Sequence, residues 1–136
     1  MISRFAAAPA RRAAAVQRDA RTQARNVDRF ADLLLWMADN PEADLSVPAL
    51  AARSVMSERS FTRRFAREVG RTPARHVLDL RLEHARRFLE ATSWTLDRIA
   101  ERSGIRTADT LHRRFRRELG MTPAAYRERH TSNTVG

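Results

Sequence analysis

Apolar side chains recur along most of the chain with the spacing of amphipathic helices. Residues 28–39 carry them at steps of three and four, at Phe30, Leu33, Leu34 and Met37. This spacing predicts a core-facing helix, which Asn40-Pro41 should end. A second stripe runs through residues 73–92, at Leu78, Leu82, Ala85 and Leu89. A helix over these residues would be about 30 Å long at 1.5 Å per residue.

An amphipathic segment of seventeen residues occurs twice, fifty residues apart. The copies are SERSFTRRFAREVGRTP, residues 57–73, and TADTLHRRFRRELGMTP, residues 107–123. Each copy begins with a hydroxyl residue that can cap a helix, and an arginine-rich helix follows. A glycine then favours a left-handed helix end. The Thr-Pro pair that comes next predicts the start of another helix.

A shorter helix with its own capping residue precedes each arginine-rich copy. The two segments are LSVPALAARS, residues 45–54, and WTLDRIAERS, residues 94–103. The turn after them is Val55-Met56 in the first copy and Gly104-Ile105-Arg106 in the second. Two helices joined by such a turn form a helix-turn-helix.

We therefore expect an all-α chain of about seven helices, built from two helix-turn-helix subdomains that share a long linker helix. The first subdomain is assigned to residues 28–72, the linker helix to 73–92 and the second subdomain to 93–130. Residues 1–27 are rich in alanine and arginine and predict a flexible basic arm. Residues 131–136 predict a polar tail.

The composition narrows the functions that this fold can serve. The 136 residues carry a net charge of +10, and all 26 basic residues are arginine, which favours polyanionic partners. The absence of cysteine excludes disulfides and thiolate chemistry. The four histidines are dispersed and no glycine-rich phosphate loop is present. We therefore expect no metal, no cofactor and no enzymatic activity. No apolar run is long enough to cross a membrane, and a cytoplasmic setting is expected.

The outward faces of the arginine-rich helices provide the candidate nucleic-acid contacts. Phe61 and Phe65 mark the buried stripe of the first helix, and Leu111 and Phe115 that of the second. The first half of a recognition helix reaches base edges, so the predicted base contacts are Arg59, Thr62, Arg63, Asp109, His112 and Arg113. The predicted contacts to the DNA backbone are Ser57, Ser60, Arg67, Thr107, Thr110, Arg116 and Arg117. For Asp109 a second interpretation stays open, as a helix-start acid or a partner of Arg113.

Residues 45–90 and 99–129 together resemble the DNA-binding domain of the AraC/XylS family of bacterial transcription regulators. The most diagnostic positions are Ile99-Ala100, Gly104, Phe115-Arg116-Arg117, Gly120, Pro123 and Tyr126. The resemblance implies seven helices and a linker helix that sets two recognition helices into adjacent major grooves. It also implies regulation at promoter DNA, often by activation through RNA polymerase. The run DLLLWMADN resembles a subgroup whose sensor domain is amidotransferase-like.

Two departures from the family pattern leave alternatives open. Val55 stands where the family usually has glycine, and a left-handed β-branched residue costs about 1–2 kcal/mol, so a strained or reshaped first turn is expected. No sensor-like segment comes before the helix-turn-helix units. The chain is therefore either a small stand-alone regulator or the DNA-binding half of a larger, effector-responsive one.

A nonspecific, architectural DNA-binding protein is the alternative function. The two unlike outward faces favour instead the reading of a defined asymmetric site. Because two half-sites are built into one chain, we expect a monomer to bind double-stranded promoter DNA.

Overall fold

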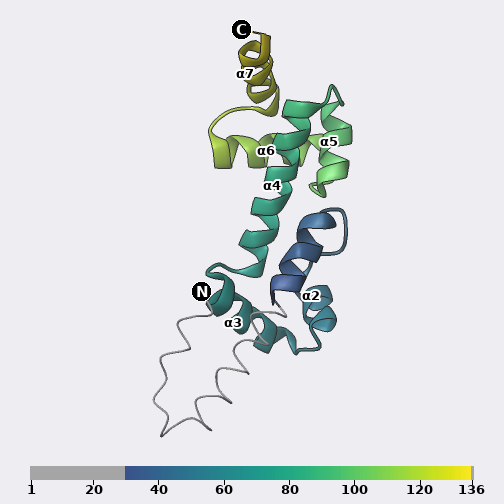
Figure 1. Cartoon of the computed structure of the whole chain (residues 1–136), viewed down its shortest axis with the longest axis vertical. Coiled ribbons are helices and arrows are strands. Elements are labelled where there is room, and N and C mark those ends of the chain that lie inside the picture. The colour runs from purple at the N-terminus through teal and green to yellow at the C-terminus, as the bar shows by residue number, and fades with distance from the viewer. Residues whose placement is uncertain (1–29, 136) are drawn as a thin grey trace, which may run out of the picture.

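The computed structural model describes residues 30–135 of the chain. Within this range the protein forms seven helices and no strand, which confirms the all-α prediction. A helix over residues 30–39 comes first. It is followed by α2 (Val47–Arg53), α3 (Glu58–Val69), α4 (Pro73–Ala91), α5 (Leu96–Ser103), α6 (Ala108–Leu119) and α7 (Pro123–Val135) (Figure 1). The predicted basic arm, residues 1–27, lies outside the described residues.

The predicted capping residues begin the central helices. The side-chain oxygen of each cap accepts a hydrogen bond from the backbone N–H three residues later, over 3.1 to 3.4 Å, at Ser46, Ser57, Thr72, Thr95 and Thr107. Each cap satisfies one of the N–H groups that the first helical turn leaves without a partner. At the other end, α3 and α6 stop at left-handed glycines, Gly70 and Gly120.

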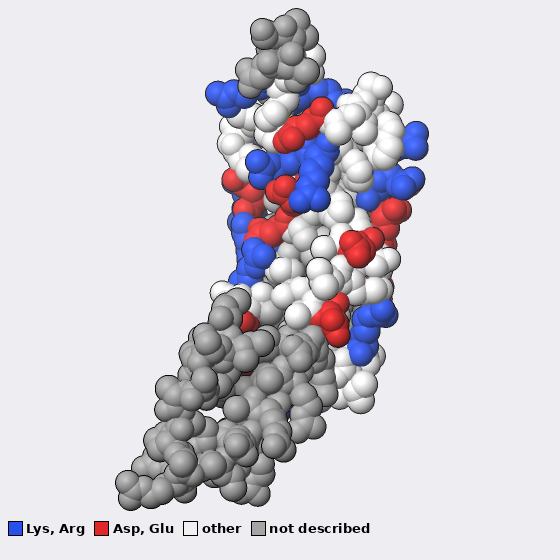
Figure 2. Space-filling model, in the orientation of Figure 1, with Lys and Arg blue, Asp and Glu red and all other residues white. Residues whose placement is uncertain are grey.

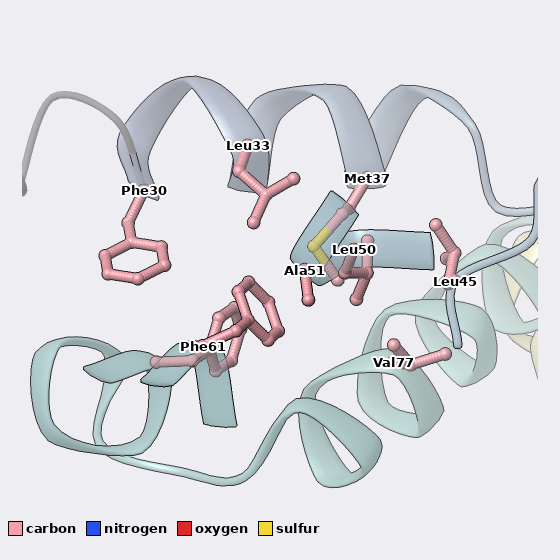
Figure 3. Packing of buried hydrophobic residues seen from close by; sticks show 9 residues of the cluster. Phe30, Leu33, Met37, Leu45, Leu50, Ala51, Phe61 and Val77 are labelled. Atoms are coloured by element: carbon pink, nitrogen blue, oxygen red, sulfur yellow. The ribbon is translucent and has the colours of Figure 1, made fainter. Parts of the chain in front are cut away.

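Two separate hydrophobic cores hold the helices together. The first joins the helix over residues 30–39 to α2, α3 and the start of α4. Figure 3 shows its side chains converging, with Phe30, Leu33 and Met37 facing Leu50 and Phe61. The second core packs the rest of α4 against α5, α6 and α7, with Leu82, Ala85, Leu89, Ile99, Leu111, Phe115 and Tyr126 among its buried members.

Helix α4 belongs to both cores. In Figure 1 it runs from the first helix-turn-helix subdomain to the second, which are called the two units below. Its early residue Val77 is buried in the first core, whereas Leu82, Ala85 and Leu89 are buried in the second. With 19 residues the helix is about 28 Å long. The apolar stripe predicted for this segment did not indicate that its burial changes from one core to the other. Helix α7 continues to Val135, through residues that the sequence assigned to the tail.

The two helix-turn-helix turns follow different backbone paths. In the first, Val55 adopts the left-handed φ of 56° that its place in the family pattern led us to expect. Its side chain is 88% exposed. In the second turn, Gly104 and Arg106 are both left-handed, with φ of 87° and 89°. One backbone hydrogen bond closes each turn. In the first, the Met56 N–H donates to the Ala51 carbonyl oxygen, and in the second, the Arg106 N–H donates to the Ala100 carbonyl oxygen.

Candidate nucleic-acid interface

Helix α3 presents its predicted base-contacting side chains on one exposed surface. Phe61 and Phe65 are fully buried, and both pack edge-on against Phe30, with ring centroids 6.1 and 5.8 Å away. This packing fixes the rotation of α3 about its axis. It leaves the opposite face to solvent, where the side chains that border one shallow hollow include Arg59, Thr62 and Arg63. The structure therefore brings these three predicted residues together.

Helix α6 presents the second set in the same manner but with an internal ion pair. Leu111 and Phe115 are fully buried, while Asp109, His112 and Arg113 are exposed. The guanidinium of Arg113 lies 3.3 Å from the Asp109 carboxylate, one helical turn earlier. Asp109 is thus the partner of Arg113 in the unbound protein, one of the two interpretations that the sequence left open for it.

The predicted backbone-contacting residues surround these two faces. The side-chain oxygens of Ser57 and Thr107 accept hydrogen bonds from the N–H groups of Ser60 and Thr110. Later on the two helices, the side chains of Arg67, Arg116 and Arg117 are exposed. Each recognition helix contains four arginines and two carboxylates. The predicted contacts therefore lie on two basic surfaces of equal formal charge.

Several arginines outside these faces are held in ion pairs, namely Arg71, Arg75, Arg86, Arg87 and Arg102. Figure 2 shows one side of the molecule on which carboxylates and arginines alternate. Arg75, for example, lies 2.5 Å from Glu118 and 3.1 Å from Asp79, and its guanidinium lowers the pKa of the Glu118 carboxyl. By contrast, within the described residues Arg59 and Arg63 make no ion pair or hydrogen bond. These two guanidinium groups of α3 are therefore available to pair with a polyanion.

A cleft between the two units contains two arginines that the predicted contacts omitted. Arg106 and Arg114 line it together with Thr110 of α6 and Arg81 of α4. Arg106 was missed because its counterpart in the first copy is Met56, so the repeat carried no signal for it. Arg114 is repeated, as Arg64, but it lies beside the buried stripe and not opposite to it.

Other kinds of site lack support in the described part of the chain. No group of three potential ligands there could hold a metal ion, and no helix there is long and apolar enough to cross a membrane. The histidines serve elsewhere: His76 packs against Phe65, and His84 contacts the Ala38 carbonyl oxygen at 2.6 Å.

Comparison with known proteins places the chain among regulators with this architecture. A family profile described as "Helix-turn-helix domain" matches residues 50–129. The HTH-type transcriptional regulator Rv1931c of Mycobacterium tuberculosis is 49% identical over 79 residues, which are 58% of this chain and 30% of the relative. The MmsAB operon regulatory protein of Pseudomonas aeruginosa is 31% identical over 94 residues, 69% of this chain and 31% of the relative. The chain thus spans about a third of the length of these relatives.

Solved structures share the fold. The DNA-binding domain of the global transcriptional factor AdpA, solved with a target DNA, is similar with a TM-score of 0.72 and 36% identity. The match covers 76% of this chain and 93% of that domain. An AraC-type transcriptional regulator from Chromobacterium violaceum has a TM-score of 0.67 and 26% identity, over 80% of this chain and 95% of that one. The chain belongs to the AraC family of helix-turn-helix transcription regulators, a family of DNA-binding proteins and not of enzymes.

Proposed function

We propose that this chain binds double-stranded DNA at a defined sequence and regulates transcription, with α3 and α6 in successive major grooves. The observation that carries the proposal is the paired display of capped, arginine-rich helices. Each turns its unpaired basic residues outward, and one helix of about 28 Å joins their units. The similar domain of AdpA was solved in complex with its target DNA. That similarity supports the same mode of binding here.

The chemistry of the exposed side chains supports sequence reading and not only attraction to phosphate. Arg59, Arg63 and Arg113 can each donate two hydrogen bonds to guanine, and His112 adds a further polar group. Arg67, Arg116 and Arg117 lie later on the helices, where they can neutralise phosphates. Because the residues on α3 differ from those on α6, the proposed site is asymmetric.

The same proposal includes the partners and the setting. One chain displays two reading helices, so one monomer is sufficient for one two-part promoter site. Activation would then proceed through contact with RNA polymerase, in the cytoplasm where bacterial promoters lie. Sedimentation of the complex on a single site measures the stoichiometry, and a ratio of one chain per duplex is expected.

Selection of binding sites from random duplexes tests the proposal. The expected result is a motif in two parts about one helical turn apart, bound at least about 10³-fold more tightly than scrambled DNA. Absence of a motif, with equal affinities and a steep salt dependence, would instead indicate the architectural alternative.

Two arginine variants then distinguish recognition of a base pair from neutralisation of phosphate charge. Arg113→Ala should cost about 1–3 kcal/mol on the selected site and relax the preference at one base pair. Arg117→Ala should weaken all sequences alike and reduce the salt slope by about one. An equal loss on specific and random DNA from Arg113→Ala would contradict its reading role, and a sequence-dependent loss from Arg117→Ala would assign that residue to reading.

A further inference from the structure

The two helix-turn-helix units are joined by more than the helix that they share. The loop over residues 40–44, which belongs to the first unit, lies against α4 and against the turn of the second unit. Its backbone is closed by the Ala43 N–H, which donates to the Asn40 carbonyl over 3.1 Å. The Asn40 side chain also bonds back to Trp36 over 2.8 Å. The loop is therefore internally braced before it contacts the second unit.

Arg81 fastens this loop to the middle of α4. Its Nε donates to the carbonyl oxygen of Pro41 over 3.0 Å, and its Nη2 donates to that of Ala43 over 3.0 Å. The two bonds use the planar fork of the guanidinium, which a lysine cannot reproduce. Arg81 is partly buried and lies on α4 between the residues of the two cores. It therefore acts where a change of angle between the units would be centred.

Gly104 lets the second unit approach the same loop. A Cβ atom at this position would lie 1.9 Å from the Pro41 carbonyl oxygen and 2.6 Å from Nε of Arg81. Both separations are far below a van der Waals contact, so only glycine permits this arrangement. The turn of the second unit is thus seated directly on the carbonyl that Arg81 holds.

Two contacts at the edge of this joint strengthen it. Glu42 of the loop pairs with Arg102 of α5 at 3.3 Å. The Arg75–Glu118 pair, at 2.5 Å, ties the start of α4 to the end of α6. In both pairs the arginine side chain is about half exposed, at 47% for Arg102 and 48% for Arg75, and ion pairs open to solvent contribute little each. The relative placement of the two units is therefore determined mainly by the forked hydrogen bonds of Arg81 and by the close approach at Gly104.

We propose that Arg81, the Pro41–Ala43 loop and Gly104 form a clamp that fixes the spacing and angle between α3 and α6, and so fixes the number of base pairs between the two parts of the DNA site. Arg81 is on this proposal a positioning residue and need not touch DNA. The inference rests on the proposed function, because a spacing can be selected only if both helices read DNA. One inserted base pair turns the second part by about 34°, at 10–10.5 base pairs per turn.

The first experiment measures affinity against spacing with the whole chain. The probes are the selected two-part duplex and duplexes with one base pair inserted or deleted between its parts. The unsubstituted protein should lose about tenfold or more on either change, since one helix then faces wrong base pairs. Arg81→Ala should bind the best duplex more weakly and lose less than about threefold on the changed ones. Arg81→Lys, which keeps the charge without the fork, should flatten the profile as well.

Arg87→Ala is the matched control, because it removes one arginine from the same helix. Arg87 is exposed and makes only a local pair with Glu83, at 3.5 Å, so its variant should keep the original spacing profile. If Arg81→Ala instead weakens every spacing by one common factor, the proposal is overturned. Circular dichroism at the working temperature confirms that each variant is folded.

A second measurement needs no DNA and therefore separates this inference from the proposed function. The chain has no cysteine, so Asp32→Cys and Glu128→Cys place one spin label on each unit. Pulsed electron resonance should give a narrow distance distribution for the labelled protein and for Arg87→Ala. Arg81→Ala should broaden it. An unchanged distribution would contradict the clamp even if DNA binding is confirmed, and a broad distribution with an unchanged spacing profile would overturn its role in choosing the site.

Discussion

The turns of the two helix-turn-helix units differ in what lies over them. Val55 and Gly104 occupy the same place, counted from the caps of the preceding helices, Ser46 and Thr95. Both are left-handed. Val55 is 88% exposed, whereas Gly104 is buried beneath Pro41. A left-handed backbone alone therefore does not require glycine here. The contact that covers the turn makes glycine obligatory in the second unit and dispensable in the first.

The recognition helices differ in a similar way. They carry the same numbers of arginines and carboxylates, yet in α3 the residues Arg59 and Arg63 are unpaired within the described structure, while in α6 Arg113 is paired with Asp109. An unpaired arginine keeps its rotamer freedom until it binds. A paired one is partly oriented beforehand. The two copies of the repeat thus place differently prepared arginines on the two proposed reading helices.

The largest expected effect comes from filling the covered turn. Gly104→Ala should lower the free energy of unfolding by about 3 kcal/mol or more, because the left-handed cost of about 1–2 kcal/mol adds to the crowding against Pro41. Urea denaturation measures the change.

Gly70→Ala provides the control for this prediction. Gly70 has a φ of 90°, but open space surrounds the site of its missing Cβ. Its variant should lose only the left-handed cost, about 1–2 kcal/mol. Equal losses at the two glycines would show that Pro41 yields to the added methyl group, and the difference between the two turns would then have no energetic consequence.

The fold could be predicted from the sequence because its signals are local. Hydroxyl caps, glycine stops and an apolar stripe of helical period each act within a few residues, and the structure confirms them at Ser57, Thr107 and Gly120. The clamp could not be predicted in this way. It joins Arg81 to a loop some forty residues earlier in the chain, and its bonds are to backbone carbonyls, which leave no pattern of side chains.

The next effect concerns the ion pair on α6. Asp109→Ala should raise the affinity for random DNA severalfold, because one carboxylate no longer repels phosphate. It should also reduce discrimination by about tenfold at the base pair that Arg113 is proposed to read, since the guanidinium loses its orienting partner. Competition between selected and single-base-altered duplexes measures both quantities.

Glu58→Ala is the matched control for that substitution. Glu58 is the acid in the first turn of α3, and within the described residues it forms no ion pair. Its removal should raise the affinity for random DNA by a similar factor and leave base preference unchanged. Intact discrimination in Asp109→Ala would mean that the Asp109–Arg113 pair does not orient Arg113 on DNA.

The exposed faces were predictable from helical geometry, whereas their pairing was not. Burial of Phe61 and Phe65 determines which residues of α3 face outward, so the positions of Arg59 and Arg63 follow from a period of 3.6 residues. Whether Arg113 bonds to Asp109 depends on rotamers that the sequence does not specify. Arg106 was hidden for another reason, because its counterpart in the first copy is Met56 and the repeat therefore carried no signal for it.

Removing the backbone strain of the first turn should change the free energy of unfolding by a smaller amount and in the opposite direction. Val55→Gly should raise the free energy of unfolding by about 0.5–1 kcal/mol, because removal of left-handed strain exceeds the entropy that glycine loses on folding. Ala52→Gly, at an exposed position of α2, should instead cost about 1 kcal/mol. Denaturation of both variants measures the difference, and a loss in Val55→Gly would show that the valine side chain stabilises the turn.

The smallest expected effect is a difference in how the stability of the two units depends on pH. His76 and Tyr126 are counterparts in the repeat. The ring of His76 packs against Phe65 of α3 and that of Tyr126 against Phe115 of α6, with centroids 5.5 and 5.2 Å apart. Burial, with a contribution from Arg71, lowers the pKa of His76, and its Nδ1 is buried with no hydrogen-bond partner among the described residues. The folded state therefore binds fewer protons than the unfolded state near the ordinary histidine pKa of about 6.5.

Stability from this group is consequently present above that pH and is lost as the pH falls through it. The pKa of Tyr126 is raised, chiefly by burial, so its ring stays neutral throughout that range. Urea denaturation between about pH 7.5 and 5.5 should show a decline that His76→Tyr, which copies the second unit into the first, makes shallower. Parallel curves for the two proteins would place the acid sensitivity outside this pair of rings, and the two units would then be alike in their response to pH.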